Sequence, residues 1–268
     1  MSPRDKKTLP VVLSIAGYDP SSGAGVTADI KTIAAHRCYA ITCITALTVQ
    51  STQGVKRVEA VDSRIIMETL EELITDFPFA AVRIGMLGSA ETVRTIAAFI
   101  RRNQPPHVVL DPVMKSSSGA ALLSREGTQI LKEKFLPLAD VITPNIDEAA
   151  ALTERVVRNQ EEMQAAALQL HKMGARNVII TGGHLDPPTD LLSLGPGHDF
   201  KVFPGQKITG NSTHGTGCAF ATALACNLAL GETLTDATKA AKQYVANAMK
   251  NAVSIGKGKG PINHLYSF

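Results

Sequence analysis

The chain has 268 residues, of which 44% are hydrophobic and 19% are charged, as is typical of a soluble globular protein. Its net charge of +3 and its aromatic content of 4% argue against nucleic-acid or membrane-surface binding. No apolar segment is long enough to span a membrane, and no apolar signal core follows the charged N-terminus. We expect a cytoplasmic protein with a flexible segment over residues 1–9.

Short apolar runs alternate with helical patterns, without an internal repeat or a clear linker, which indicates one domain over residues 1–268. We expect strands at Val11–Ala16, Ala40–Val49, Val55–Val61, Ala80–Ile84, Val108–Leu110, Val141–Thr143, Asn177–Thr181, Asp190–Leu194 and Phe200–Phe203. We expect helices at Gly25–His36, Ser63–Asp76, Ala90–Asn103, Ser124–Lys134, Asn159–Gly174, Gly217–Leu230 and Thr235–Ser254. This alternation predicts a mostly parallel sheet with helices on both faces, in which ligands bind beyond the carboxyl ends of the strands.

Two motifs follow the first two predicted strands. A glycine-rich turn over residues 16–25 leads into a helix, and it either walls a small-molecule pocket or is an ordinary connecting loop. Asp29, one turn into that helix, complements the helix dipole. Gln50 ends the second strand with an amide that donates and accepts, which suits an aminopyrimidine edge, although a lone Gln there is more often solvated.

Three further strand ends carry residues suited to a site. Met86 lies in a tight turn and is either core filler or a pocket wall. Asp111 ends a short apolar strand, where it either caps a loop or holds Mg²⁺ through water. Asn145 and Glu148 have the spacing of a helix capping box, and the alternative is that both point at magnesium-bound phosphate.

The most informative stretch is His214-Gly215-Thr216-Gly217-Cys218, which opens an alanine-rich apolar helix. Glycines let backbone N–H groups approach an anion closely, and a helix N-terminus adds unpaired donors and a positive dipole end. The same dipole is expected to acidify the Cys218 thiol. A phosphate cradle beside an ionisable thiol suggests phosphoryl transfer, although residues 210–217 do not match a Walker A motif.

Two sequence features concern the rest of the chain. The four cysteines lack zinc-ligand spacing and lie mostly in apolar runs, so we expect reduced thiols. The glycine- and lysine-rich segment over residues 256–261 is more often a solvated terminus than a nucleotide contact.

Seven motifs in this order resemble hydroxymethylpyrimidine/phosphomethylpyrimidine kinases of thiamine biosynthesis, a branch of the ribokinase-like superfamily. They are AGYDPSSGAG, QSTQGV, RIGMLG, LDPVM, TPNIDEA, TGGH and STHGTGC, and the match runs from about Val11 to His264. The resemblance implies a three-layer α/β/α sandwich without a separate lid domain, and a homodimer. It also implies two successive phosphorylations of 4-amino-5-hydroxymethyl-2-methylpyrimidine with ATP and Mg²⁺.

The resemblance also assigns roles by matching motif positions. Cys218 becomes the catalytic base, and Gly215, Thr216 and Gly217 form the anion hole. The remaining assignments are Gln50, Gly17, Ala24, Met86 and Val113 for the pyrimidine, Asn145, Thr216 and Thr181 for ATP, and Glu148 for the metal, to which the strand-end position adds Asp111. Two residues depart from the family pattern: Thr181 stands where Lys is common, and Ser22 stands where Gly is usual.

Three other functions stay open. A pyridoxal or pyridoxine kinase shares the fold and an HGTGC-type site, but Gln50 and Met86 favour a pyrimidine. A carbohydrate kinase is disfavoured, because a sugar-binding pocket would need more carboxylate and amide side chains in the first two motifs. A third alternative is a protein that binds the pyrimidine without catalysis, because Thr181 replaces the Lys that would contact the ATP phosphates.

Overall fold

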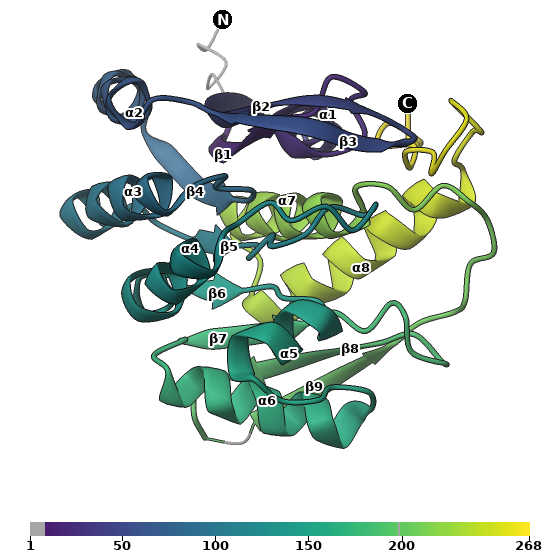
Figure 1. Cartoon of the computed structure of the whole chain (residues 1–268). Coiled ribbons are helices and arrows are strands. Elements are labelled where there is room, and N and C mark those ends of the chain that lie inside the picture. The colour runs from purple at the N-terminus through teal and green to yellow at the C-terminus, as the bar shows by residue number, and fades with distance from the viewer. Residues whose placement is uncertain (1–8, 198) are drawn as a thin grey trace, which may run out of the picture.

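The computed structural model describes residues 9–197 and 199–268, so most of the segment predicted to be flexible lies outside the described residues. One nine-stranded sheet runs through the molecule in the order β3-β2-β1-β4-β5-β6-β7-β8-β9 (Figure 1). The strands are β1 Val11–Tyr18, β2 Tyr39–Ser51, β3 Gly54–Ala60, β4 Phe79–Ile84, β5 Val108–Leu110, β6 Val141–Ile142, β7 Asn177–Ile180, β8 Thr189–Leu194 and β9 Asp199–Pro204.

The sheet is mostly parallel, as the sequence predicts. Strands β2, β1, β4, β5, β6 and β7 pair in parallel, whereas β3, β8 and β9 join antiparallel at the two edges. Because parallel strands place their carboxyl ends at one edge of the sheet, the loops that follow β1, β4, β5, β6 and β7 gather there.

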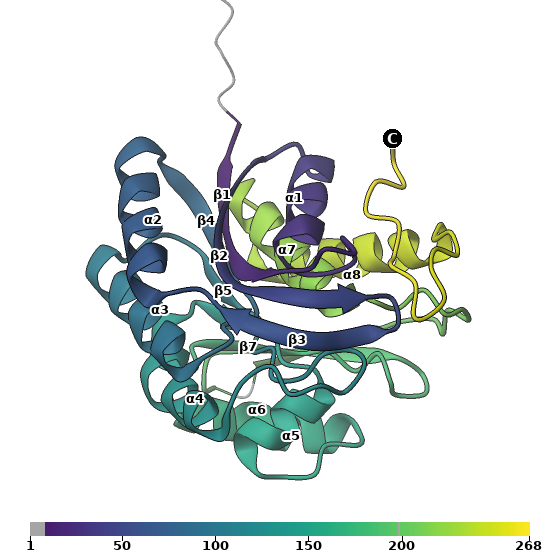
Figure 2. The same ribbon diagram turned by 45° about the horizontal axis from the view of Figure 1, so that its top comes forward.

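Helices cover both faces, which gives the expected three layers (Figures 1 and 2). Helices α1, α7 and α8 cover one face, and α2 to α6 cover the other, with no separate lid domain in the described part. Their bounds are α1 Gly25–Ala35, α2 Ser63–Asp76, α3 Ala90–Asn103, α4 Arg125–Ile130, α5 Ile146–Thr153, α6 Gln160–Lys172, α7 Thr216–Ala229 and α8 Leu234–Lys250.

Strand alternation divides the apolar residues between two cores. Leu13 and Ile15 of β1 face the core under α2 to α6, whereas Val12 between them faces the core under α1, α7 and α8. Successive side chains of a strand point to opposite faces, so a central parallel strand must be apolar on both. This explains why the central strands show little polar–apolar alternation in the sequence.

Side-chain caps fix where most helices begin. Asp62, Ser89, Ser124, Asn159 and Thr233 each accept a hydrogen bond from a backbone N–H of the first turn. Such caps satisfy donors that the helix itself leaves unpaired, and each contributes about 1 kcal/mol.

The structure differs from the predicted elements in a few places. Helix α5 was predicted only through its cap and not as an element, because at eight residues it is too short to show a clear period. The predicted helix over residues 124–134 ends its α-helical part at Ile130 and continues as a π-helical turn, Leu131–Phe135. The last helix ends at Lys250 and not at Ser254.

All four cysteines are free thiols, which agrees with the expected reduced state. Among the described helices, none combines the length and apolar character that crossing a bilayer would need.

Candidate active site

A cavity of about 510 Å³ opens at the carboxyl ends of the parallel strands. Every residue that the sequence analysis assigned to the site lines it: Gly17, Ala24, Gln50, Met86, Asp111, Val113, Asn145, Glu148, Thr181, Gly215, Thr216, Gly217 and Cys218. The structure thus brings residues from seven separate motifs to one place, although the role of each remains a prediction.

The first turn of α7 forms one end of the cavity. Gly215 caps this helix with a φ of +84°, and a side chain there would collide with the carbonyl oxygen of Gly23. Gly217 has open space where a Cβ would stand. The backbone N–H groups of residues 216–218 therefore begin a helix beside an open cavity, the geometry in which a helix terminus stabilises an anion.

Cys218 lies on this turn and lines the cavity, half-buried. The expected acidification is wrong for this structure: burial raises the pKa of the Cys218 thiol to about 11. The Arg83 guanidinium favours the thiolate, but the acids Asp111 and Asp29 oppose it, and loss of solvation outweighs the favourable charge.

A buried charge cluster lies beneath the thiol. Arg83 of β4 has no solvent exposure and pairs with Asp29 of α1 at 3.0 Å and with Asp111 after β5 at 2.7 Å. Asp29 also accepts hydrogen bonds from Ser14 at 2.6 Å and from Thr222 at 2.6 Å. Asp29 is therefore a structural ion-pair partner that joins α1, β4 and α7, and its predicted role as a partner of the helix dipole is wrong.

Asn145 and Glu148 form the capping box that the sequence allows. Asn145 Oδ1 accepts from the Glu148 backbone N–H at 2.9 Å, and Glu148 Oε2 accepts from the Asn145 N–H at 2.9 Å. Both side chains still line the cavity. Thr181, which follows β7, donates its backbone N–H to Pro144 at 2.9 Å and so lies beside this cap.

The carboxylates of the cavity, Glu148 and Asp111, suit a divalent cation whose remaining ligands are oxygens of water and of a bound phosphate. Burial, together with the nearby Asp111 carboxylate, raises the pKa of Glu148 to about 8. Burial likewise raises the pKa of Asp111 to about 6 against the pull of Arg83. A bound cation would relieve this excess of buried acid. Within the described residues no group of three or more His, Cys, Asp or Glu side chains forms a metal cage.

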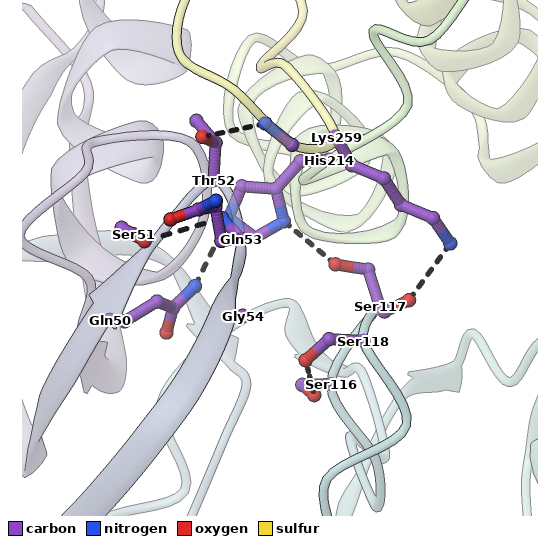
Figure 3. Close-up of a pocket in the computed structure, with 11 residues that line it drawn as sticks. Gln50, Ser51, Thr52, Gln53, Gly54, Ser116, Ser117, Ser118, His214 and Lys259 are labelled. Atoms are coloured by element: carbon purple, nitrogen blue, oxygen red, sulfur yellow. Dashed lines mark hydrogen bonds between the residues drawn. The ribbon is translucent and has the colours of Figure 1, made fainter.

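His214, which also lines the cavity, contacts Gln50 at the end of β2 and Ser117 in the loop after β5 (Figure 3). His214 Nε2 lies 2.8 Å from Asp19 Oδ2 and 3.2 Å from Gln50 Nε2, and its Nδ1 lies 3.0 Å from Ser117 Oγ. When Nε2–H donates to Asp19, this nitrogen has no lone pair for the Gln50 amide. The Gln50 NH₂ group is then left to donate to a ligand.

The apolar wall of the cavity is shaped by a close backbone approach. Met86 is buried, and its sulfur would lie 2.8 Å from a Cβ added to Gly17. Val113 packs against the same small cluster with Ala46 and Leu122. The backbone N–H of Ala24 donates to Asp19 at 2.9 Å, which holds the glycine-rich loop against the cavity.

Three parts of the site were missed from the sequence. They are the Asp19–His214 pair, the Asp29–Arg83–Asp111 cluster, and Lys259 at the cavity edge. Only Arg83 carried a local signal, because a charged residue inside an apolar strand needs a buried partner. The partners lie far apart in the chain, so no short motif shows them.

A mostly parallel α/β sheet, with a cavity at its strand ends and a glycine-rich helix N-terminus that lines this cavity, is the architecture of a small-molecule phosphotransferase. A family profile for phosphomethylpyrimidine kinase matches residues 19–263. The hydroxymethylpyrimidine/phosphomethylpyrimidine kinase of Haemophilus influenzae is 42% identical over 258 residues, covering 94% of this chain and 96% of that protein. The chain belongs to the phosphomethylpyrimidine kinase family.

Other relatives differ in length or name. A thiamine biosynthesis bifunctional protein of Geobacter sulfurreducens is 42% identical over 95% of this chain, which spans about half (52%) of that relative. The phosphomethylpyrimidine kinase structure from Clostridium difficile matches with a TM-score of 0.79 and 37% identity, covering 90% of this chain and 99% of that one. An ADP complex of Bacillus subtilis pyridoxal kinase matches with a TM-score of 0.87 and 32% identity, covering 96% and 98%.

Proposed function

We propose that this chain phosphorylates 4-amino-5-hydroxymethyl-2-methylpyrimidine with ATP and then phosphorylates the monophosphate to the diphosphate, in thiamine biosynthesis. The proposal depends mainly on one observation: the Gln50 amide and the first turn of α7 line the same cavity. The family match supports both acceptors. The chain acts as one kinase domain over residues 1–268.

Each residue contributes a simple function in this reaction. Gln50 donates to a ring nitrogen, and Gly17, Ala24, Met86 and Val113 enclose the ring. Residues 215–217 donate backbone N–H groups to the transferring phosphoryl group, and Asn145 and Thr181 contact ATP. The alcohol oxygen forms a bond to the γ-phosphorus, the bond from that phosphorus to the ADP oxygen breaks, and the Cys218 thiolate takes the hydroxyl proton.

Glu148 and Asp111 would hold Mg²⁺ when it is bound, and the ion would neutralise charge on the phosphate oxygens. With its raised pKa of about 11 the Cys218 thiol keeps only a small thiolate fraction at neutral pH, so the first step should speed up as pH rises. In the second step the attacking phosphate oxygen is already anionic, so the thiol matters less there.

A test compares ADP release with Mg-ATP and three separate acceptors: the pyrimidine alcohol, its monophosphate, and pyridoxal. The proposal requires turnover of both pyrimidines. Pyridoxal kinase is the second candidate, because the Bacillus subtilis pyridoxal kinase superposes well. Turnover of pyridoxal alone would establish that alternative, and binding without any ADP release would establish a non-catalytic module.

Location and assembly complete the proposal. We place the enzyme in the cytoplasm, supported by its four free thiols. We also propose a homodimer, supported by the exposed apolar side chains Tyr39, Leu47 and Val49 along β2. Sedimentation equilibrium tests the dimer: a single species at the 28.4 kDa chain mass would contradict it.

A further inference from the structure

The sequence favoured a solvated terminus for the basic segment over residues 256–261. In the structure this segment instead lies against the site. Gly258 N–H donates to Thr52 Oγ1 at 3.2 Å, and the His214 N–H donates to the Gly260 carbonyl at 3.1 Å. A side chain at Gly258 would collide with the Thr52 carbonyl. Glycine therefore allows the segment to press against the loop after β2 and to carry Lys259 to the cavity edge.

Lys259 borders a second, smaller cavity of about 230 Å³ (Figure 3). The smaller cavity shares Gln50, Ser116, Ser117, His214 and Lys259 with the large one, so the two adjoin. Its other lining residues are Ser51, Thr52, Gln53, Gly54, Ser118 and Gly258. The lining holds hydroxyl and amide donors and one lysine but no carboxylate, which favours an anion.

The Lys259 ammonium has a neutral hydrogen-bond acceptor in the structure. Its Nζ donates to the Ser117 carbonyl oxygen at 3.0 Å, and no ion pair of this lysine with a carboxylate occurs in the described part of the chain. A neutral carbonyl stabilises an ammonium less than an anion does. A phosphate that enters beside Ser117 would therefore compete well for Lys259.

The position of Lys259 favours an acceptor phosphate over a nucleotide phosphate. Asn145 and Thr181, the proposed ATP contacts, do not line the small cavity, whereas Gln50 lines both. Phosphorylating the alcohol adds a charge of about −1.5 to −2 to the acceptor, and Lys259 is the cationic side chain that lines the small cavity.

We propose that Lys259, with the hydroxyl groups around the small cavity, binds the phosphate of the phosphorylated acceptor and so favours the second phosphorylation. The inference rests on the proposed function. It makes Lys259 a specificity-determining residue that distinguishes the monophosphate from the alcohol.

The test measures kcat/KM for the alcohol and for the monophosphate in Lys259→Met, Lys259→Arg and Lys257→Met. Lys257 is exposed in the same segment and lines neither cavity, so its variant controls for charge alone. Loss of one charge-assisted contact should lower the ratio of monophosphate to alcohol kcat/KM about 10- to 100-fold in Lys259→Met. Lys259→Arg keeps the charge and should retain most of the ratio, and Lys257→Met should retain all of it.

Two further measurements separate the outcomes. Calorimetric titration of the monophosphate without ATP should show weaker binding to Lys259→Met than to the wild type. An unchanged ratio, or a KM for ATP that rises as much as that for the monophosphate, overturns the inference. A wild-type enzyme that phosphorylates the alcohol but does not bind the monophosphate also overturns it, while the first step of the proposed function stands.

Discussion

Two glycines at the start of α7 differ in what a side chain would meet, and substitutions should separate stability from catalysis. At Gly215 a methyl group would collide with Gly23 at a φ of +84°, whereas at Gly217 nothing lies within 4 Å. We expect Gly215→Ala to lower the free energy of unfolding by about 1–3 kcal/mol. Gly217→Ala should change it by less than about 0.5 kcal/mol and still slow turnover, because its methyl group enters the phosphate space.

Urea unfolding and an ADP-release assay on the two variants test this pair. Equal losses of stability would show that both glycines serve the fold alone. Full activity in Gly217→Ala would show that the first turn does not approach the phosphoryl group.

Cys218 gives a prediction that the raised thiol pKa makes sharper. Since the thiol is mostly protonated below its pKa of about 11, the thiolate fraction and the first-step rate should rise with pH from 7 to 9. Cys218→Ala should lower the first-step kcat by ~10²–10⁴ and flatten this rise. The second step should lose less, because its nucleophile is already an anion.

Steady-state rates for the two acceptors across this pH range provide the measurement. Near-wild-type turnover of the alcohol by Cys218→Ala would remove the base assignment. Equal losses in both steps would instead indicate that the thiol only positions its neighbours.

Single residues of the site could be predicted where a strand end or a helix start marked them. Gln50, Asp111 and the residues 215–218 all lie at such points and line the cavity. The Asp19–His214 contact joins residues 195 positions apart, and no local pattern encodes it. The thiol acidity failed for a related reason, because burial depends on how α7 packs and not on its first turn alone.

The ion pairs of Arg83 connect β4 with α1 and with the loop after β5. Replacing Arg83 should therefore lower the free energy of unfolding of the whole fold. Arg83→Met leaves Asp29 and Asp111 buried without their cation, and we expect it to cost about 3–5 kcal/mol of unfolding free energy. Asp29→Asn leaves the Arg83–Asp111 pair intact and should cost much less. Adding Asp29→Asn to Arg83→Met should therefore restore part of the loss.

Urea denaturation of the two single variants and the double variant forms a double-mutant cycle. The account is contradicted if the losses of unfolding free energy in the two single variants add up in the double variant. It is also contradicted if Asp29→Asn costs more unfolding free energy than Arg83→Met. Arg64→Met provides a control, because it removes an exposed ion pair, keeps the Asp62 cap of α2 and should leave the stability almost unchanged.

His264 anchors the C-terminal segment to α1 and α8 and should make the fold acid-sensitive. Its Nδ1 lies 3.1 Å from Thr32 Oγ1, and burial lowers the pKa of His264 to about 4 from the usual 6.5. The unfolded chain therefore takes up the proton first as pH falls. Stability contributed by neutral His264 is complete above pH 6.5 and declines by up to about 3 kcal/mol toward pH 4.

The unfolding free energies of wild type and His264→Asn, compared from pH 7.5 to pH 4, test this dependence. The wild type should lose more stability than the variant across that range. The matched change at exposed His107 should leave the wild-type slope unchanged. Parallel slopes for wild type and His264→Asn would contradict the account.

Elements were predictable where length and burial gave a clear pattern. The bounds of α2, α3 and β5 match the prediction. The short α5 did not show its period, and the π-helical turn after Ile130 requires tertiary packing that no local pattern specifies. The order of the strands depended on the general rule for parallel sheets and on the resemblance, because pairing is a long-range property.

At the scale of the molecule, the mostly parallel sheet explains how residues from distant parts of the chain come to line one cavity. Its strand ends carry Met86, Asp111 and the Asn145 cap, while α7 packs across the sheet so that its N-terminus meets them. The antiparallel pair of β2 and β3 adds Gln50, and the C-terminal segment adds Lys259. Sequence alone did not predict this last contact.

The central claim is that a single cavity performs two successive phosphoryl transfers to one pyrimidine. A ³¹P NMR time course, started with the hydroxymethylpyrimidine, excess Mg-ATP and the purified chain, tests it most directly. The account predicts that a monophosphate resonance grows first and is then replaced by the paired resonances of a diphosphate. A reaction that stops at the monophosphate, or that proceeds only when pyridoxal replaces the pyrimidine, would contradict it.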